Sequence, residues 1–153
     1  MLFRSSMVAT GPKRPSSLLH GRGHEWSAAV QTWLDRPVLG AGAASYYVAS
    51  VRHQGAGASL YAHNLPLELA AELGVLGLLL GLSLYLAGGV LVYQSLQRTG
   101  VWLLAPLVCA FLISNLLDWT WHLAGLGALW ALAAGALAAA APSAKRGEET
   151  QLR

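Results

Sequence analysis

A histidine at position 63 is the residue of this chain that is best suited to proton transfer. It stands in the stretch Tyr61-Ala-His-Asn-Leu-Pro66, directly before a long apolar run. An imidazole group changes its charge near neutral pH. Where a water-exposed segment meets an apolar helix, it can act as a base or orient a hydroxyl group. We therefore predict that His63 is the catalytic residue.

Three arginines upstream of His63 are candidates for binding an anion. A guanidinium group is planar, stays charged and can bind two phosphate oxygens at once. Arg22 precedes a short amphipathic segment, Arg36 follows it, and Arg52 lies in the next segment. We predict that all three bind substrate, with Arg22 as the first choice. Arg36 could instead neutralise the negative C-terminal end of a helix.

Further polar residues lie where the apolar run starts. Asn64 can accept a hydrogen bond from a free backbone N–H, and Pro66 is tolerated in a first turn, so a helix should begin near Leu65. Glu68 and Glu72 are four residues apart and share a helix face, which should point at protein or water rather than lipid. We predict that Asn64 and Glu72 also bind substrate.

A second polar junction, Asp118-Trp-Thr-Trp-His122, separates two later apolar runs. Its two tryptophans suit a membrane–water interface. Asp118 and His122 could approach the site around His63 or simply lie at that interface. The histidines and acidic residues show no cluster with metal-ligand spacing, and the single cysteine, Cys109, lies in an apolar segment. We therefore predict neither a metal site nor a cofactor.

The elements that must position these residues are helices in a membrane. Of the 153 residues, 55% are hydrophobic and only 11% are charged, which is too apolar for an ordinary soluble domain. Roughly 20 apolar residues in a helix cross a bilayer core of about 30 Å. The sequence predicts an all-α polytopic membrane protein. Its membrane domain, residues 63–141, should contain about three transmembrane helices, near residues 65–92, 101–117 and 123–141.

More polar segments flank this membrane domain. We expect residues 1–62 to form an extracytoplasmic loop with a short amphipathic helix at about 25–35, and residues 142–153 to form a charged cytoplasmic tail. Residues 48–62 should be a flexible surface segment, and Gly40-x-Gly42 a tight turn rather than a phosphate loop. The net charge is +3, but the basic residues are scattered, so we expect no nucleic-acid partner.

Basic residues near the span ends predict the orientation. The connection at 94–100 and the C-terminal tail share one side and contain four of them: Arg98, Lys145, Arg146 and Arg153. On the other side only Arg52 is close to a span. Because positive charge favours the cytoplasm, we expect a multi-pass protein of the inner (cytoplasmic) membrane with His63 on the extracytoplasmic side.

Small residues at four-residue spacing suggest contacts between helices. Gly77 and Gly81 share one face, and Gly127, Ala131 and Gly135 share another. Such faces let a neighbouring helix approach closely. Nothing in the first residues would start the export of the basic segment before the first span. We therefore expect further N-terminal transmembrane helices that this sequence lacks.

Two of these segments resemble motifs of the O-antigen ligase and polymerase superfamily. Arg36-Pro-Val-Leu-Gly-Ala-Gly42 is similar to the family's "nPllGvG" turn, and His63 to Gly77 is similar to its "HNxxLxxxxExGxxG" entrance helix. Gly21-Arg22 before Trp26, and Asp118-Trp119-x-Trp121, are also like some members. The resemblance covers about residues 21–135, which correspond to the C-terminal third of a typical member.

The resemblance implies an enzyme that transfers a glycan from undecaprenyl diphosphate, a polyprenyl-diphosphate carrier, to an acceptor hydroxyl during the synthesis of cell-surface polysaccharide. The implied partners are the lipid bilayer and the carrier-linked glycan. The reaction needs cations for the leaving diphosphate, a base for the acceptor and a groove for the lipid. Two alternatives stay open: a non-catalytic membrane remnant or subunit, and a transporter of the same superfamily.

Overall fold

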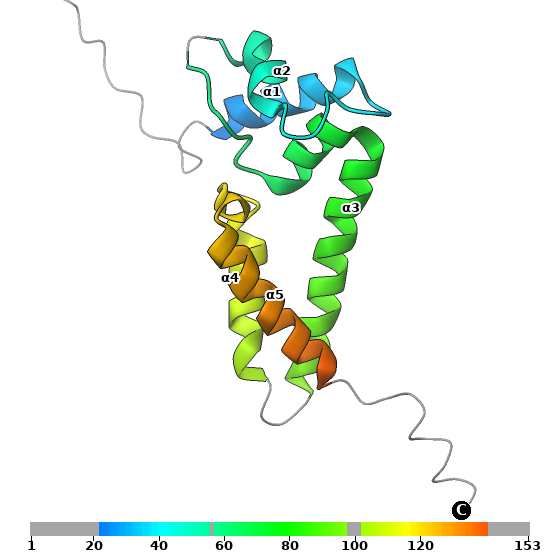
Figure 1. Cartoon of the computed structure of the whole chain (residues 1–153), viewed down its shortest axis with the longest axis vertical. Helices are drawn as coiled ribbons and strands as arrows, with labels where there is room; N and C mark the ends of the chain where they lie inside the picture. Colours follow the sequence, from blue (N-terminus) through cyan, green and yellow to red (C-terminus); the bar gives the residue numbers. More distant parts are fainter. Residues whose placement is uncertain (1–21, 56, 98–101, 141–153) are drawn as a thin grey trace, which may run out of the picture.

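The computed structural model describes residues 22–55, 57–97 and 102–140, and every regular element in these ranges is helical (Figure 1). The predicted all-α class is therefore confirmed for this part of the chain. The predicted tail at 142–153 and residues 1–21 of the predicted loop lie outside the described residues. The elements are α1 (Arg22–Asp35), α2 (Tyr46–Gln54), α3 (Leu65–Leu96), η1 (Trp102–Leu104), α4 (Ala105–Ser114), η2 (Thr120–His122) and α5 (Ala124–Ala139).

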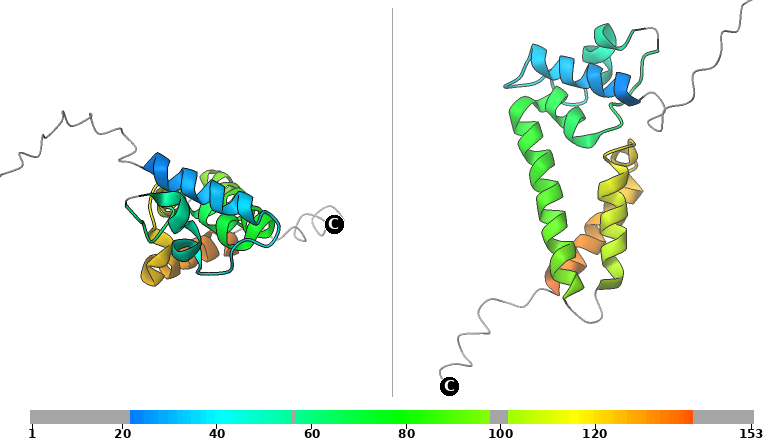
Figure 2. Two further views of the ribbon diagram at one scale, coloured as in Figure 1. Left: turned by 90° about the horizontal axis from the view of Figure 1, so that it is seen from above. Right: turned by 180° about the vertical axis from the view of Figure 1, so that it is seen from behind.

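Helices α1 and α2 form a cap over one end of the molecule, and α3, α4 and α5 extend away from it (Figures 1 and 2). The described part of the predicted 48–62 loop is not all flexible surface, because α2 covers Tyr46–Gln54. Its buried residues, Tyr46, Ser50 and Gln54, recur every four residues as on one helix face. Two of the three are polar, so hydrophobicity did not reveal this helix.

Helix α3 is broken at Gly74, where φ is +66° and ψ is −147°. The first part of the helix folds back on the second. A Cβ atom built on Gly81 would lie only 3.3 Å from the Cα atom of Pro66, which shows how close the two parts are. Gly77 and Gly81 thus accommodate the helix's own first turns rather than a separate helix. The predicted first span at about 65–92 is therefore not one straight rod. The unbroken apolar part starts at Val75, and its roughly 22 residues extend about 33 Å.

The loop between α1 and α2 docks into this break. The N–H groups of Ala41 and Gly42 donate to the carbonyls of Ala71 and Glu72 at 2.9 and 2.8 Å. In the opposite direction, the N–H of Val75 donates to the carbonyl of Pro37 at 2.8 Å. The predicted turn at Gly40-x-Gly42 is confirmed, with positive φ at both glycines. The two segments that resemble family motifs therefore form one interlocked unit.

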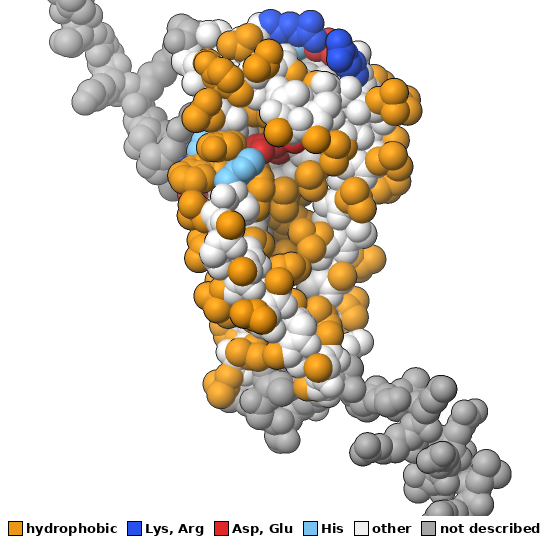
Figure 3. Space-filling view, viewed as in Figure 1, with side chains coloured by type: hydrophobic (Ala, Val, Ile, Leu, Met, Phe, Trp, Pro, Cys, Tyr) orange, Lys and Arg blue, Asp and Glu red, His pale blue; other side chains and the backbone are white. Residues whose placement is uncertain are grey.

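Among the described residues, only α3 is long and apolar enough to cross a membrane. Helices α4 and α5 have 10 and 16 residues, so at 1.5 Å per residue neither reaches about 30 Å. They pack on the lower part of α3 through a core of Val108, Leu112, Ala133, Ala134 and Leu137. Leucines of α3 such as Leu79, Leu80 and Leu86 remain more than half exposed and give an apolar surface (Figure 3).

The small-residue face predicted on α5 makes no contact within the described chain. Nothing in the described structure lies within 4 Å of a Cβ atom built on Gly127 or Gly135. The buried face of α5 consists instead of Ala133, Ala134 and Leu137.

Candidate functional site

Four charged or titratable side chains meet where the cap joins α3 and α4. Arg22 and Glu25 come from α1, His63 from the loop before α3, and Asp118 from the loop after α4. The Nδ1 atom of His63 lies 3.4 Å from Oδ1 of Asp118, and its Nε2 atom lies 3.8 Å from Oε2 of Glu25. Nη1 of Arg22 lies 3.8 Å from the same Oδ1 of Asp118. We call these four residues the His63 cluster.

The backbone around His63 holds the ring in place. His63 has a φ of +53°, a left-handed conformation that costs a non-glycine residue about 1–2 kcal/mol. Such strain is found more often at functional sites than elsewhere. The preceding N–H, of the buried Ala62, donates to Oε2 of Glu68 at 2.8 Å. The left-handed turn directs the His63 side chain, 16% of which is exposed, between the two carboxylates.

Asn64 fastens the start of α3. Its Oδ1 atom accepts a hydrogen bond from the N–H of Leu67 at 3.0 Å, which confirms the predicted helix cap. Its Nδ2 atom donates to the carbonyl of Leu116 at 3.0 Å, so the same side chain ties α3 to the end of α4. These bonds set the distance between His63 and Asp118. The substrate contact of Asn64 stays a prediction.

The His63 cluster contains an ionised carboxylate and two buried polar atoms that make no hydrogen bond within the described structure. Partial burial raises the pKa of Asp118, but the N–H of Trp119, the His63 ring and Arg22 outweigh it and lower that pKa below 3.8. Asp118 is therefore ionised at neutral pH. Nη1 of Arg22 and Oε2 of Glu25 are buried and make no hydrogen bond within the described structure. Buried polar atoms normally have a partner, so these two atoms are suited to hold a polar ligand.

His122 belongs to a neighbouring cluster. Its Nε2 atom lies 2.7 Å from Oε1 of Glu68, a residue that is only 4% exposed. Of the two possibilities left open for the 118–122 junction, approach to the site applies to Asp118, which lies beside His63, whereas His122 pairs with Glu68. Glu68 points at protein, as its shared helix face with Glu72 predicted.

Glu72 holds the cap on α3 rather than contacting His63. Its Oε2 atom accepts from the N–H of Ala44 at 2.9 Å, and its Oε1 atom accepts from the N–H of Tyr46 at 3.0 Å. The carboxylate thus caps the first turn of α2, where negative charge is stabilising. Both oxygens are engaged in this structural role, and a substrate contact of Glu72 stays a prediction.

We expect the substitution Glu72→Gln to lower the free energy of unfolding by about 1–2 kcal/mol. The amide nitrogen cannot accept a hydrogen bond, so one of the two N–H groups at the start of α2 loses its partner. Circular dichroism during urea unfolding in detergent would measure the change. Gln31→Ala, an exposed substitution on α1, is the control and should change stability by less than about 0.5 kcal/mol. Equal stability of Glu72→Gln and the wild type would contradict this role.

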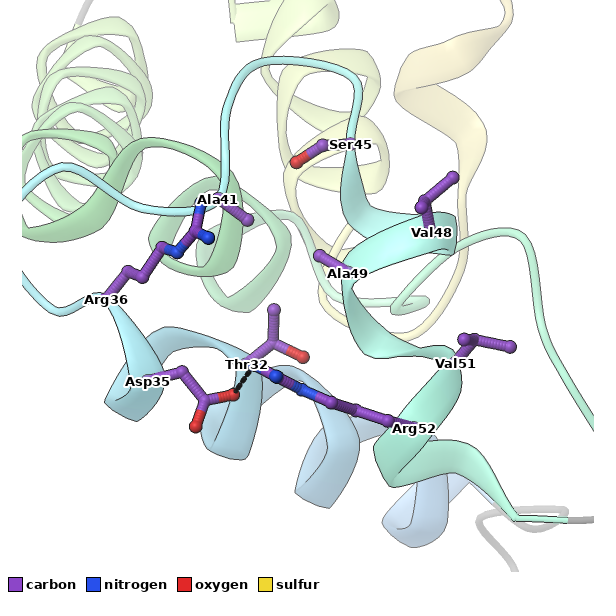
Figure 4. Close-up of a pocket in the computed structure, with 9 residues that line it drawn as sticks. All are labelled: Thr32, Asp35, Arg36, Ala41, Ser45, Val48, Ala49, Val51 and Arg52. Carbon is purple, nitrogen blue, oxygen red and sulfur yellow. Dashed lines mark hydrogen bonds and ion pairs between the residues drawn. The ribbon is translucent and has the colours of Figure 1, made fainter.

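Arg36 and Arg52 lie apart from the His63 cluster, at a pocket of about 400 Å³ between α1 and α2 (Figure 4). The guanidinium of Arg52 bonds to Asp35, and Nε2 of His53 lies 2.7 Å from the same carboxylate. The hydrogen bond from His53 is the main cause of a lowered pKa at Asp35. Of the three predicted arginines, the structure therefore brings only Arg22 to His63.

Comparison with known proteins identifies the family. A family model described as O-antigen ligase matches residues 2–82, which is about half of the chain. The chain belongs to the O-antigen ligase family. The match confirms the resemblance predicted from the motifs, and it contains Arg22, Glu25 and His63 of the cluster. Searches among curated proteins and among solved structures found no match.

Membership of the O-antigen ligase family fits a membrane protein, as does the one long apolar helix of the described chain. The motif comparison did not identify every member of the His63 cluster. Glu25 was missed, although it lies three residues after Arg22 and a three-residue spacing places both on one side of a helix. The available signal was a charge of opposite sign on the same side of a short amphipathic helix.

Proposed function

We propose that this O-antigen ligase-family chain transfers a glycan from a polyprenyl-diphosphate carrier to an acceptor hydroxyl, with the His63 cluster as its catalytic centre. One observation carries the proposal. A histidine lies between two carboxylates beside an arginine, and buried atoms of Arg22 and Glu25 have no hydrogen-bond partner within the described residues. This set supplies a base and a cation, two of the three features that the reaction needs.

The proposed base is Nε2 of His63. When Nδ1–H of His63 donates to Asp118, the lone pair of Nε2 faces Glu25, 3.8 Å away. An acceptor hydroxyl that donates its proton to Nε2 would lie beside this carboxylate. As the hydroxyl oxygen bonds to the anomeric carbon of the glycan, its proton passes to Nε2. The ionised Asp118 stabilises the imidazolium that forms.

The proposed cation is Arg22. The bond between the anomeric carbon and the diphosphate oxygen breaks, and its electron pair leaves with the diphosphate. A guanidinium group near this oxygen offsets the developing charge. Nη1 of Arg22 lies 3.8 Å from Asp118 and has no hydrogen-bond partner in the described structure, so it is placed to donate to a phosphate oxygen. Arg36 and Arg52 would contact a more distant part of the substrate at their own pocket.

The proposal places the chain in the inner membrane as a multi-pass protein with His63 on the extracytoplasmic side. The exposed leucines of α3 support contact with lipid. The open face at Gly127 and Gly135 supports packing of a further transmembrane helix against α5. The carrier's lipid would lie along these apolar surfaces.

Transfer in proteoliposomes tests the proposal. The chain is reconstituted with an undecaprenyl-diphosphate-linked glycan and a lipid that has a sugar headgroup. We expect Arg22→Ala to reduce transfer by about 10²–10³-fold, and Arg22→Lys to reduce it less, because lysine keeps the charge but loses the planar fork. His24→Ala, an exposed neighbour on α1, is the control. No transfer by the wild type, or full transfer by Arg22→Ala, would overturn the proposal.

A further inference from the structure

Four aromatic rings beside the His63 cluster contact one another in a row, through one stacked pair and two tilted pairs. The rings of Tyr61 and Trp119 are parallel to within 17°, with centroids 5.5 Å apart. Tyr61 also contacts the His122 ring, which is tilted by 35° at a centroid distance of 4.1 Å. His122 in turn lies 5.0 Å from the Trp121 ring. We call these four residues the aromatic stack.

Hydrogen bonds hold parts of the aromatic stack in place. Nε2 of His122 lies 2.7 Å from Oε1 of Glu68, and the other oxygen of Glu68 accepts from the N–H of Ala62 at 2.8 Å. One carboxylate thus fixes both the His122 ring and the backbone that carries Tyr61. The backbone N–H of Trp119 donates to Asp118 at 2.8 Å, which holds the backbone that carries the Trp119 ring. Rigid rings bind a ligand with little loss of side-chain entropy.

The aromatic stack is adjacent to the proposed base. Tyr61 precedes His63 by two residues, and Trp119 directly follows Asp118. Histidine and acidic side chains meet at this level of the surface, between the cap and the lower helices (Figure 3). Trp119 is 36% exposed, so it is open to solvent beside the His63 cluster.

The aromatic stack suits a sugar ring. A pyranose has a face that is rich in C–H groups with slight positive charge, and the face of an aromatic ring is slightly negative. We propose that the aromatic stack is a sugar-binding platform that seats the acceptor pyranose with a hydroxyl toward His63. This inference rests on the proposed function, because it assigns the position of that reaction's acceptor.

Anchoring at the membrane interface is the competing role for these rings. An interfacial aromatic residue needs only an apolar body in the lipid and a polar tip in water. It needs neither a tyrosine ring in contact with two further rings nor a histidine held by a buried glutamate. These ring contacts and the Glu68–His122 pair therefore favour recognition of a flat ligand over anchoring alone.

Saturation-transfer NMR tests the platform without requiring transfer. The probe is methyl β-D-galactopyranoside, added to the full chain in lipid nanodiscs that contain no glycoside detergent. We expect signal on the ring C–H protons with the wild type and a loss of about fivefold or more with Trp119→Ala. Trp119→Leu keeps apolar bulk without a ring and should show the same loss. Trp33→Phe on α1 is the control and should bind as the wild type does.

The outcomes distinguish a sugar-binding platform from a set of interface anchors. No signal with the wild type, or unchanged signal with both Trp119 variants, would overturn the platform. Weaker retention of the Trp119 variants in floated vesicles, with sugar signal intact, would identify the rings as interface anchors. His63→Ala should lose less of the sugar signal than the Trp119 variants do. If the Trp119 variants lose the signal but His63→Ala transfers normally, the proposed reaction fails while the platform stands.

Discussion

Replacing His63 by alanine should reduce glycan transfer by about 10²–10⁴-fold, the range expected when a general base is removed. Asp118 cannot replace it on the Nε2 side of the ring. Asp118 is held as an ionised carboxylate by Trp119, His63 and Arg22, and it lies on the Nδ1 side of the ring. Initial rates in the proteoliposome assay would measure the loss.

Two further variants separate a chemical role of His63 from a structural one. His63→Asn places a residue that tolerates positive φ at this left-handed position, so it should fold as the wild type does and still lack activity. Free imidazole added to His63→Ala should restore part of the activity, which a purely structural histidine would not allow.

The matched control is His53→Ala. His53 is also a histidine paired with a carboxylate, because its Nε2 atom lies 2.7 Å from Asp35. It contacts Asp35, which lines the pocket between α1 and α2, and it lies outside the His63 cluster. We expect transfer within about threefold of the wild type for a residue outside the centre. An equal loss in both variants would mean that the fold, rather than proton transfer, limits the rate.

The sequence predicted local features of the site well because short-range physics determines them. The cap formed by Asn64 and the helix start at Leu65 depend on neighbouring residues only. The tight turn at Gly40-x-Gly42 follows from glycine's access to positive φ. The choice of His63 and Arg22 came from side-chain chemistry and motif context, and the structure brings these two residues to a common carboxylate, Asp118.

Long-range features escaped prediction. The run from Leu73 to Val92 contains no charged residue. The sequence alone does not show whether a glycine such as Gly74 continues a helix or breaks it. The break is decided by the Pro37–Gly42 loop, which supplies partners for the freed backbone groups from 30 or more residues away. Helix α2 was missed for a different reason: its buried face carries the polar Ser50 and Gln54, whose side chains form hydrogen bonds within the helix, so hydropathy gave no signal.

The substitution Gly74→Ala should destabilise the fold by about 4 kcal/mol, a size seen only when a specific structural feature is lost. The backbone at Gly74, with φ +66° and ψ −147°, is in a region open almost only to glycine. A Cβ atom there would also lie 2.2 Å from the carbonyl oxygen of Val38. The loop would have to leave the break, and α1 would lose its anchor on α3. Urea unfolding in detergent, followed by circular dichroism, would measure this.

Gly89→Ala is the matched control on the same helix. Nothing in the described structure lies within 4 Å of a Cβ atom at Gly89, so alanine there should change stability by about 1 kcal/mol or less. If Gly74→Ala and Gly89→Ala behave alike, α3 is a continuous helix and the interlocked unit does not exist.

The partner glycine gives an independent check of the same contact. A Cβ atom on Gly40 would lie 2.2 Å from the carbonyl oxygen of Glu72, so Gly40→Ala should cause a loss similar to that of Gly74→Ala. Because both substitutions displace one loop from one break, the double variant should lose little more than either single variant. Additive losses would mean that the two glycines serve separate contacts. Non-additive losses would show that both family-like segments act together to set the position of α1, and with it the distance from Arg22 and Glu25 to His63.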